Sequence, residues 1–347
     1  MRCLIPLLVT LTVAACTTTG APTAPTEPTL FYARNGSIYL SDLNGSPAQK
    51  LTDGPGDTQP APSPDGRRVA YVHKTRSDEA GGELWVVDVA SGAKRRLVDP
   101  ADLAPKFTGE DRPGIEDPRW SPAGDRIAFL KSSAGGGGFL LTATPDTGAV
   151  TAPPEIVFAD FGYTWSPDGT HIAWVGGRSD VSPVDVNVLT IGGESTSVAK
   201  DTNAFAVSYS GDGSSVLFAN GDAHGRLYAA IPFVLRDGGI YSVEPPAQPT
   251  PLISGTAAYA DVTGLPSGAV GFTEWSQDWR TKSVLVLGPD RTLRKIADTP
   301  GDAPRPAWAG EDGVAYIGTA DDHPLMVSRK GVTTTVDVGA DAFAWAG

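Results

Sequence analysis

This sequence of 347 residues is poor in cysteine, in positive charge and in long apolar runs. Its two cysteines, Cys3 and Cys16, both lie near the N-terminus, so no disulfide can join distant parts of the chain. Lys and Arg number 27 against 40 Asp and Glu, which gives a net charge of −13. Nucleic-acid binding requires a basic surface, so a nucleic-acid partner is not expected.

Charged residues make up only 19 % of the chain, whereas Gly (41) and Pro (30) are abundant. This composition disfavours long surface helices and favours short strands joined by tight turns. Common catalytic motifs are missing as well. The sequence contains no G-x-S-x-G nucleophile elbow and no H-x-H or H-E-x-x-H metal-ligand spacing.

The N-terminal segment has the features of an export signal. Arg2 precedes the apolar run Leu4–Ala15, which is too short to cross a bilayer permanently but has the length of a secretory signal. Val13-Ala14-Ala15-Cys16 resembles a bacterial lipobox, so residues 1–15 are predicted to be a lipoprotein signal peptide and Cys16 the lipidated residue. An ordinary signal peptide with an incidental cysteine is the alternative.

Residues 16–29 are rich in Thr and Pro and contain almost nothing apolar. Such a segment is predicted to be a solvated, semi-extended tether. A diacylglyceryl group on Cys16 supplies the two acyl chains that stable anchoring requires. We therefore expect a protein held by its lipid on the extracytoplasmic face of the cell membrane.

A short strand motif of small and aromatic residues recurs seven times. The copies are LFYA (30–33), VAYV (69–72), IAFL (127–130), IAWV (172–175), VLFA (216–219), VGFT (270–273) and VAYI (314–317). From Tyr71 onward their aromatic residues are 58, 45, 44, 54 and 44 positions apart. A four-stranded propeller blade takes about 40–50 residues.

Turns with their own chemistry precede these strands. SPDG occurs at 63–66 and 166–169, and SPAG at 121–124. Pro presets φ, Asp bonds its own backbone and Gly accepts a positive φ. A bulky aromatic residue stands before several of the turns. These residues are expected in the core: Trp120, Trp165, Tyr209 and Trp308.

The C-terminal DAFAWAG (341–347) matches the segment that opens a repeat, and Trp345 is likewise expected in the core. Pairing it with the first copy would close a ring and remove exposed sheet edges. Residues 30–347 are therefore predicted to be all-β, a seven-bladed β-propeller of four-stranded antiparallel blades. The C-terminal strand is expected to pair with the N-terminal blade.

The W-S-P-D-G turns, the IAF and IAW strands and the following ELWVVD strand (83–88) together resemble TolB-like propellers. The resemblance covers residues 30–347 and implies the propeller fold, here in a bacterial lipoprotein. We expect a monomer that acts as a non-catalytic binding module for an envelope protein or glycan. We expect no enzymatic activity, and an enzyme is the alternative.

Acidic residues recur just before the expected innermost strands: Asp57, Asp117, Asp160, Asp261, Asp302 and Asp341. If several of them meet at the mouth of the channel, they could bind Ca²⁺ or receive a cationic peptide segment. Alternatively they cap loops and face water. No other cofactor and no other metal is expected.

Another candidate is the segment EWSQDWR (274–280), which offers Trp275, Trp279 and Arg280. Trp and Arg are the usual components of an interface hot spot or a sugar-stacking platform. The alternative is that one Trp packs over the edge of a blade. The irregular insert 99–115 is expected on the same face as these three residues.

The competing function is a metal-dependent sugar lyase or lactonase with its site in the channel. It would require His73, His171, His224 and His323 to converge with carboxylates. The four histidines occupy different positions in their repeats, which favours surface or strand-end roles. One further oddity is the apolar segment 227–243, expected as either a projecting hairpin or a buried strand pair.

Overall fold

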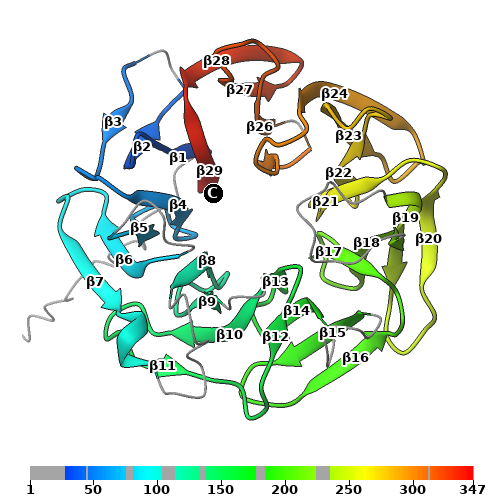
Figure 1. Ribbon diagram of the computed structural model, residues 1–347, viewed down its shortest axis with the longest axis horizontal. Helices are drawn as coiled ribbons and strands as arrows, with labels where there is room; N and C mark the ends of the chain where they lie inside the picture. The colour runs from blue at the N-terminus through cyan, green and yellow to red at the C-terminus, as the bar shows by residue number, and fades with distance from the viewer. Residues whose placement is uncertain are drawn as a thin grey trace, which may run out of the picture.

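The computed structural model describes residues 28–43, 46–75, 81–103, 114–132, 137–176, 184–223, 235–311 and 313–346. Their strands form seven sheets arranged as a ring (Figure 1). The predicted signal peptide 1–15, Cys16 and the tether up to residue 27 lie outside the described residues. Within the described part, no helix is both long and apolar enough to cross a membrane.

Each sheet is one blade, and its strands run outward from the centre of the ring. Blade 1 has β29 (Ala340–Ala346), β1 (Thr29–Arg34), β2 (Ser37–Ser41) and β3 (Gln49–Lys50); blade 2 has β4 (Asp57–Pro62), β5 (Arg68–His73), β6 (Glu83–Asp88) and β7 (Lys94–Val98). Blade 3 has β8 (Ile115–Trp120), β9 (Ile127–Ser132), β10 (Gly138–Ala143) and β11 (Val150–Thr151), with β12 (Phe158–Ala159) also pairing with β10. Blade 4 has β13 (Tyr163–Trp165), β14 (His171–Gly176), β15 (Asp185–Thr190) and β16 (Ser195–Ala199).

The last three blades follow the same order. Blade 5 has β17 (Ala204–Tyr209), β18 (Val216–Ala223), β19 (Leu235–Val243) and β20 (Thr250–Ser254). Blade 6 has β21 (Tyr259–Gly264), β22 (Val270–Trp275), β23 (Thr281–Leu287) and β24 (Leu293–Pro300); blade 7 has β25 (Ala307–Trp308), β26 (Gly313–Ile317), β27 (Pro324–Arg329) and β28 (Val332–Val338).

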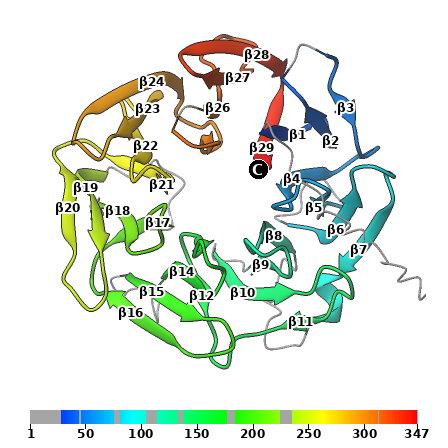
Figure 2. The same ribbon diagram turned by 180° about the vertical axis from the view of Figure 1, so that it is seen from behind.

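The ring closes through blade 1, which takes strands from both ends of the described chain. β1 pairs antiparallel with β29, in a register that sets Tyr32 opposite Phe343. Figure 2, the view from behind, shows β29 at the centre of the ring beside β1. The predicted seven-bladed, C-terminally closed propeller is confirmed.

The recurring motif forms the second strand of every blade. In β5, residues Val69, Ala70 and Val72 are fully buried and Tyr71 nearly so. The run is continuously apolar because neighbouring blades cover both of its faces, whereas a strand with one solvated face alternates.

Tryptophan side chains at the ends of the inner strands link neighbouring blades. The indole N–H of Trp120 donates to Ala61 O (2.8 Å), that of Trp165 to Arg119 O (3.1 Å) and that of Trp345 to Ala307 O (2.9 Å). Each acceptor belongs to the inner strand of the preceding blade. Trp120 and Trp165 are buried and Trp308 and Trp345 are half-buried, so these rings pack between blades as expected.

Candidate functional site

The inner strands of three blades carry a bulge with a left-handed residue at the same place. Gln59, Asp117 and Asp261 have φ of 52°, 50° and 53°, and each coincides with a register shift against the second strand. A bulge leaves its extra residue out of the ladder and redirects its side chain. Asp117 stands three residues before Trp120, and Arg305 holds the same position before Trp308 of blade 7.

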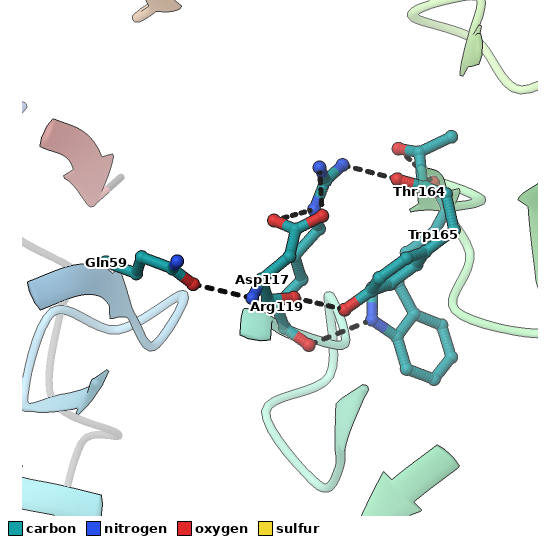
Figure 3. A network of polar contacts seen from close by, with 6 residues as sticks. Gln59, Asp117, Arg119, Thr164 and Trp165 are labelled. Carbon is teal, nitrogen blue, oxygen red and sulfur yellow. Dashed lines mark hydrogen bonds and ion pairs between the residues drawn. The ribbon is translucent and has the colours of Figure 1, made fainter. Parts of the chain in front are cut away.

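A polar network joins blades 2, 3 and 4 at this level (Figure 3). The Asp117 N–H donates to Gln59 Oε1 (2.6 Å), and Arg119 donates from Nε and a terminal nitrogen to the two Asp117 oxygens (3.0 and 2.7 Å). Arg119 also donates to Tyr163 O, and the Tyr163 hydroxyl donates to Asp117 O (2.6 Å). Burial raises the pKa of Tyr163 well above its usual range, so the phenol stays a donor.

The network borders a cavity of about 620 Å³ between the inner strands β4, β8 and β29 and the segment before β25. Its charged lining residues are Glu116, Asp117, Arg119 and Arg305. A volume of this size is typical of small-ligand sites.

Arg305 differs from Arg119 in lacking a partner. Within the described residues its guanidinium takes part in no hydrogen bond and no ion pair, and its side chain is exposed to the cavity. The charge of Arg119, followed by desolvation, lowers the pKa of Arg305 to about 10. Both arginines therefore remain charged at neutral pH and repel each other across the cavity.

Three of the acidic candidates are engaged by neighbouring side chains. Asp57 is 4 % exposed and its Oδ1 lies 2.6 Å from His73 Nδ1. Asp117 pairs with Arg119, as described above. Asp261 accepts a hydrogen bond from the Thr273 hydroxyl (2.8 Å) and lies 3.4 Å from Lys282 Nζ.

The other three acidic candidates lie differently. Asp302 and Asp341 are exposed, and Asp160 is half-buried beside Gly176. Desolvation by the surrounding protein raises the pKa of Asp341, against the opposing charge of Lys74. Among the described residues, no group of three or more His, Cys, Asp or Glu could hold a metal ion.

The segment Trp275–Arg280, here called the Trp loop, lies beside the entry to blade 7. Its two indole rings are half-buried with centroids 5.1 Å apart, and Arg280 is exposed. The Gly301 N–H donates to Arg280 O (2.8 Å). Lys282 Nζ donates to Ala303 O (3.0 Å) and lies 5.3 Å from the Trp275 ring. The structure therefore brings the Trp loop together with Asp261 and with the segment that contains Asp302.

The Trp loop contains a turn that the sequence motif did not reveal. The Ser276 hydroxyl donates to Asp278 Oδ1 (2.8 Å), as Ser63 does to Asp65 and Ser166 to Asp168 (both 2.6 Å). Trp279 thus holds the position of Gly66 and Gly169, with φ of 61° where those glycines have 67° and 72°. The missed signal is the Ser-x-Asp spacing, hidden because Gln and Trp replace Pro and Gly.

The three described histidines lie in blades 2, 4 and 7. His73 bonds Asp57, His171 lies 2.7 Å from the Thr170 hydroxyl at the start of β14, and His323 is in a turn before β27. His224 lies outside the described residues.

Two irregular segments are described only in part. Of the insert 99–115, residues 104–113 fall outside the described part, and Pro100–Asp102 form a short 3₁₀ helix, η1. Of 227–243, only residues 235–243 are described, and they form β19 in its ordinary place between β18 and β20.

Arg119 and Arg305, the two cations that line the cavity, were not predicted from the sequence. One signal was available, because both stand one to three residues before the ring that ends an inner strand.

No protein-family model matches the chain. The uncharacterized peptidase YuxL of Bacillus subtilis (strain 168) is 30 % identical over 118 residues, which is 33 % of this chain and 16 % of that protein. The chain thus spans about a sixth of the relative's length.

Solved structures resemble the whole ring. The tricorn protease matches 91 % of this chain and 34 % of its own, with a TM-score of 0.64 and 13 % identity. For TolB from Acinetobacter baumannii, the match covers 94 % of this chain and 68 % of TolB, with a TM-score of 0.53 and 15 % identity. For an oligogalacturonate lyase in complex with manganese, it covers 89 % of this chain and 83 % of the lyase, with a TM-score of 0.58 and 13 % identity. At such identities a shared fold says nothing of shared activity. The protein has the fold of TolB-like β-propellers.

Proposed function

We propose that this protein is a lipid-anchored, extracytoplasmic propeller that binds a protein or glycan of the cell envelope without catalysing a reaction. The lipobox-like segment ending at Cys16 and the Thr/Pro-rich tether support the location. The rigid ring supports a binding role, because it presents loops from several blades on one face.

The observation that carries the proposal is the backbone of Trp279. A bulky residue at φ 61° is strained by about 1–2 kcal/mol, and the matching turns avoid the strain with Gly. Strain of this kind persists only where the surrounding structure fixes it, and it clusters at binding and active sites. Here it presents a half-exposed indole beside Trp275 and the exposed Arg280, which is the composition of an interface hot spot.

The proposal predicts that Trp279→Gly folds normally and loses its partner. Relief of the left-handed strain offsets the lost ring contact, so the free energy of unfolding changes by less than about 1 kcal/mol. The partner is captured by proximity labelling of the native protein in its own envelope, and the variant is expected to label it at least tenfold less. Denaturant unfolding measures the stability.

Two controls accompany this experiment. Trp165→Ala, a core Trp, is expected to cost about 3–5 kcal/mol, and Arg67→Gln, in a turn away from the Trp loop, is expected to keep the labelling. Unchanged labelling by Trp279→Gly would refute the binding surface. Cys16→Ala should move the protein from the membrane to the soluble fraction, and full membrane retention would refute the anchor.

A further inference from the structure

Among the described residues, the outer strand of each blade is the edge of its sheet, and most of these edges are protected. β3 and β11 have two residues each, and β16 has five, with the Ser195 N–H at its start bonded to Glu155 Oε1 (2.7 Å). β7 begins with the basic residues Lys94–Arg96. β20 contains Pro251, and β24 carries three charged residues and a terminal proline. Short length, charge and proline all hinder pairing with another chain.

β28 (Val332–Val338) lacks these features. It has seven residues without a proline, and it pairs with β27 along its whole length. Its one charged residue, Asp337, is turned toward blade 1, where its carboxylate accepts hydrogen bonds from Arg34 (2.5 Å) and from the Tyr32 hydroxyl. Figure 1 shows β28 on the outer rim of the ring. It is therefore the least protected edge of the propeller.

The side chains of β28 are suited to a neighbouring strand. Residues 332–335 are exposed, and three of them are threonines. Val332 is 65 % exposed, more than any other large apolar residue of the described chain, and Val338 at the far end is 43 % exposed. β-branched residues pack well against a neighbouring strand, and threonines pair with each other across strands. An unprotected edge with such side chains favours the addition of a strand.

The two ends of β28 carry opposite charges. Arg329 and the exposed Lys330 lie where β28 begins. Asp321 and Asp322 are exposed in the turn before β27, and the pairing of β27 with β28 puts this turn where β28 ends. A second β28 in antiparallel orientation would bring its Lys330 beside the acidic turn of the first. Two-fold symmetry would form this contact twice.

We propose that β28 pairs antiparallel with β28 of a second copy of this chain when both copies are anchored in one membrane. The proposal rests on the lipid anchor of the proposed function. Pairing of two such strands is expected to bury less than the roughly 1,200 Å² of a specific stable interface. Free chains of net charge −13 also repel each other, so dilute chains stay monomeric. Anchoring raises the effective concentration of the copies.

A strand from another protein is the competing occupant of this edge. The order of charges favours the second copy, because an antiparallel strand has to be basic before its paired residues to meet Asp321 and Asp322. β28 itself has this order, with Arg329 and Lys330 directly before it.

The test uses the full chain in the membranes of its own envelope, with Thr334→Cys near the middle of β28. Copper phenanthroline oxidises two thiols that meet to a disulfide, and non-reducing gel electrophoresis measures the dimer. Thr196→Cys is the matched control, because Thr196 is an exposed threonine on β16, the outer strand of blade 4. Both variants keep Cys16, so a cross-link through it would be common to both. We expect at least fivefold more dimer from Thr334→Cys.

A charge exchange then identifies the second copy. Lys330→Glu, or Asp321→Lys combined with Asp322→Lys, is expected to lower the Thr334→Cys dimer at least threefold, because each change brings like charges together. All three substitutions in one chain restore opposite charges and are expected to restore the dimer. The three side chains are exposed, so the melting temperature is expected to stay that of the wild type.

Three results would overturn the proposal: equal dimer from Thr334→Cys and Thr196→Cys, cross-linking of Thr334→Cys to a different protein, or a charge exchange that does not restore the dimer. Fractionation of the same cells reports the anchor separately. Chains that reach the membrane fraction without forming the dimer overturn the pairing alone. Chains absent from that fraction overturn the anchor and this proposal with it, and neither result bears on partner labelling through Trp279.

Discussion

Lys131 places an ammonium group inside blade 3. The residue lies in β9, is 0 % exposed, and its Nζ has no hydrogen-bond partner among the described residues. Burial lowers its pKa, because the interior disfavours the charged form. A charge buried without a partner destabilises the fold, since its lost hydration is not replaced.

Replacing Lys131 by Met is therefore expected to stabilise the protein by about 1–3 kcal/mol at pH 7. Since the folded pKa is lowered, the unfolded state binds more protons as pH approaches the unfolded value of about 10.4, and wild-type stability rises there. The advantage of Lys131→Met should accordingly shrink between pH 7 and pH 10. Urea unfolding at both pH values measures it, and an advantage that does not change with pH would contradict this account.

At the scale of the elements, the turns hold neighbouring blades together. The glycines of three turns, Gly124, Gly169 and Gly213, face the proline of the turn before, and a Cβ at Gly124 would lie 3.7 Å from Pro64 Cδ. The same atom at Gly213 would lie only 3.2 Å from Pro167 Cδ. Their backbones are alike, with φ of 71° and 75°.

Comparing alanine variants of these two glycines separates the energetic cost of backbone strain from the cost of crowding a neighbouring blade. Gly124→Ala is expected to cost about 1 kcal/mol, because only the left-handed conformation opposes the new Cβ. Gly213→Ala should cost about 1 kcal/mol more, because the Cβ also presses on Pro167. Denaturant unfolding of both variants compares them, and equal costs would show that the blades do not pack through their turns.

The strands and turns were predictable because their patterns are local. Seven copies of one buried strand, all but the first after a turn with fixed Pro, Asp or Gly positions, define the blades without any long-range information. Trp279 was predicted as a site residue, but its strain was not, because it depends on a turn in which Gln and Trp replace the usual residues. The pairing of Asp57 with His73 escaped prediction because it depends on the register between β4 and β5.

At the scale of the whole molecule, the channel brings together residues that the sequence keeps far apart. Arg119 of blade 3 and Arg305, just before the inner strand of blade 7, line one cavity only because the ring closes. No local sequence pattern predicts that these two residues line the same cavity. Ring closure itself was predictable, because DAFAWAG repeats the first strand of a blade at the end of the chain.

Closure makes β29 the element on which the whole ring depends. It pairs with β1 from Thr29↔Ala346 to Arg34↔Ala340 and ties blade 7 through the bond from Trp345 to Ala307 O. Deleting residues 340–347 would expose the edge of β1 and uncover Leu30 and Phe31, which are fully buried in the intact ring. An open apolar edge invites pairing with another chain.

We therefore expect the chain without residues 340–347 to melt at a lower temperature and to form dimers or larger species in light scattering. A synthetic peptide of residues 340–347 should restore the monomer and most of the melting temperature, since it can add to β1 as a strand. A scrambled peptide of the same composition should do neither, because the register sets Trp345 against Ala307 O and Phe343 opposite Tyr32. A truncated chain that stays monomeric and melts like the wild type would show that the other six blades hold the ring without its closing strand.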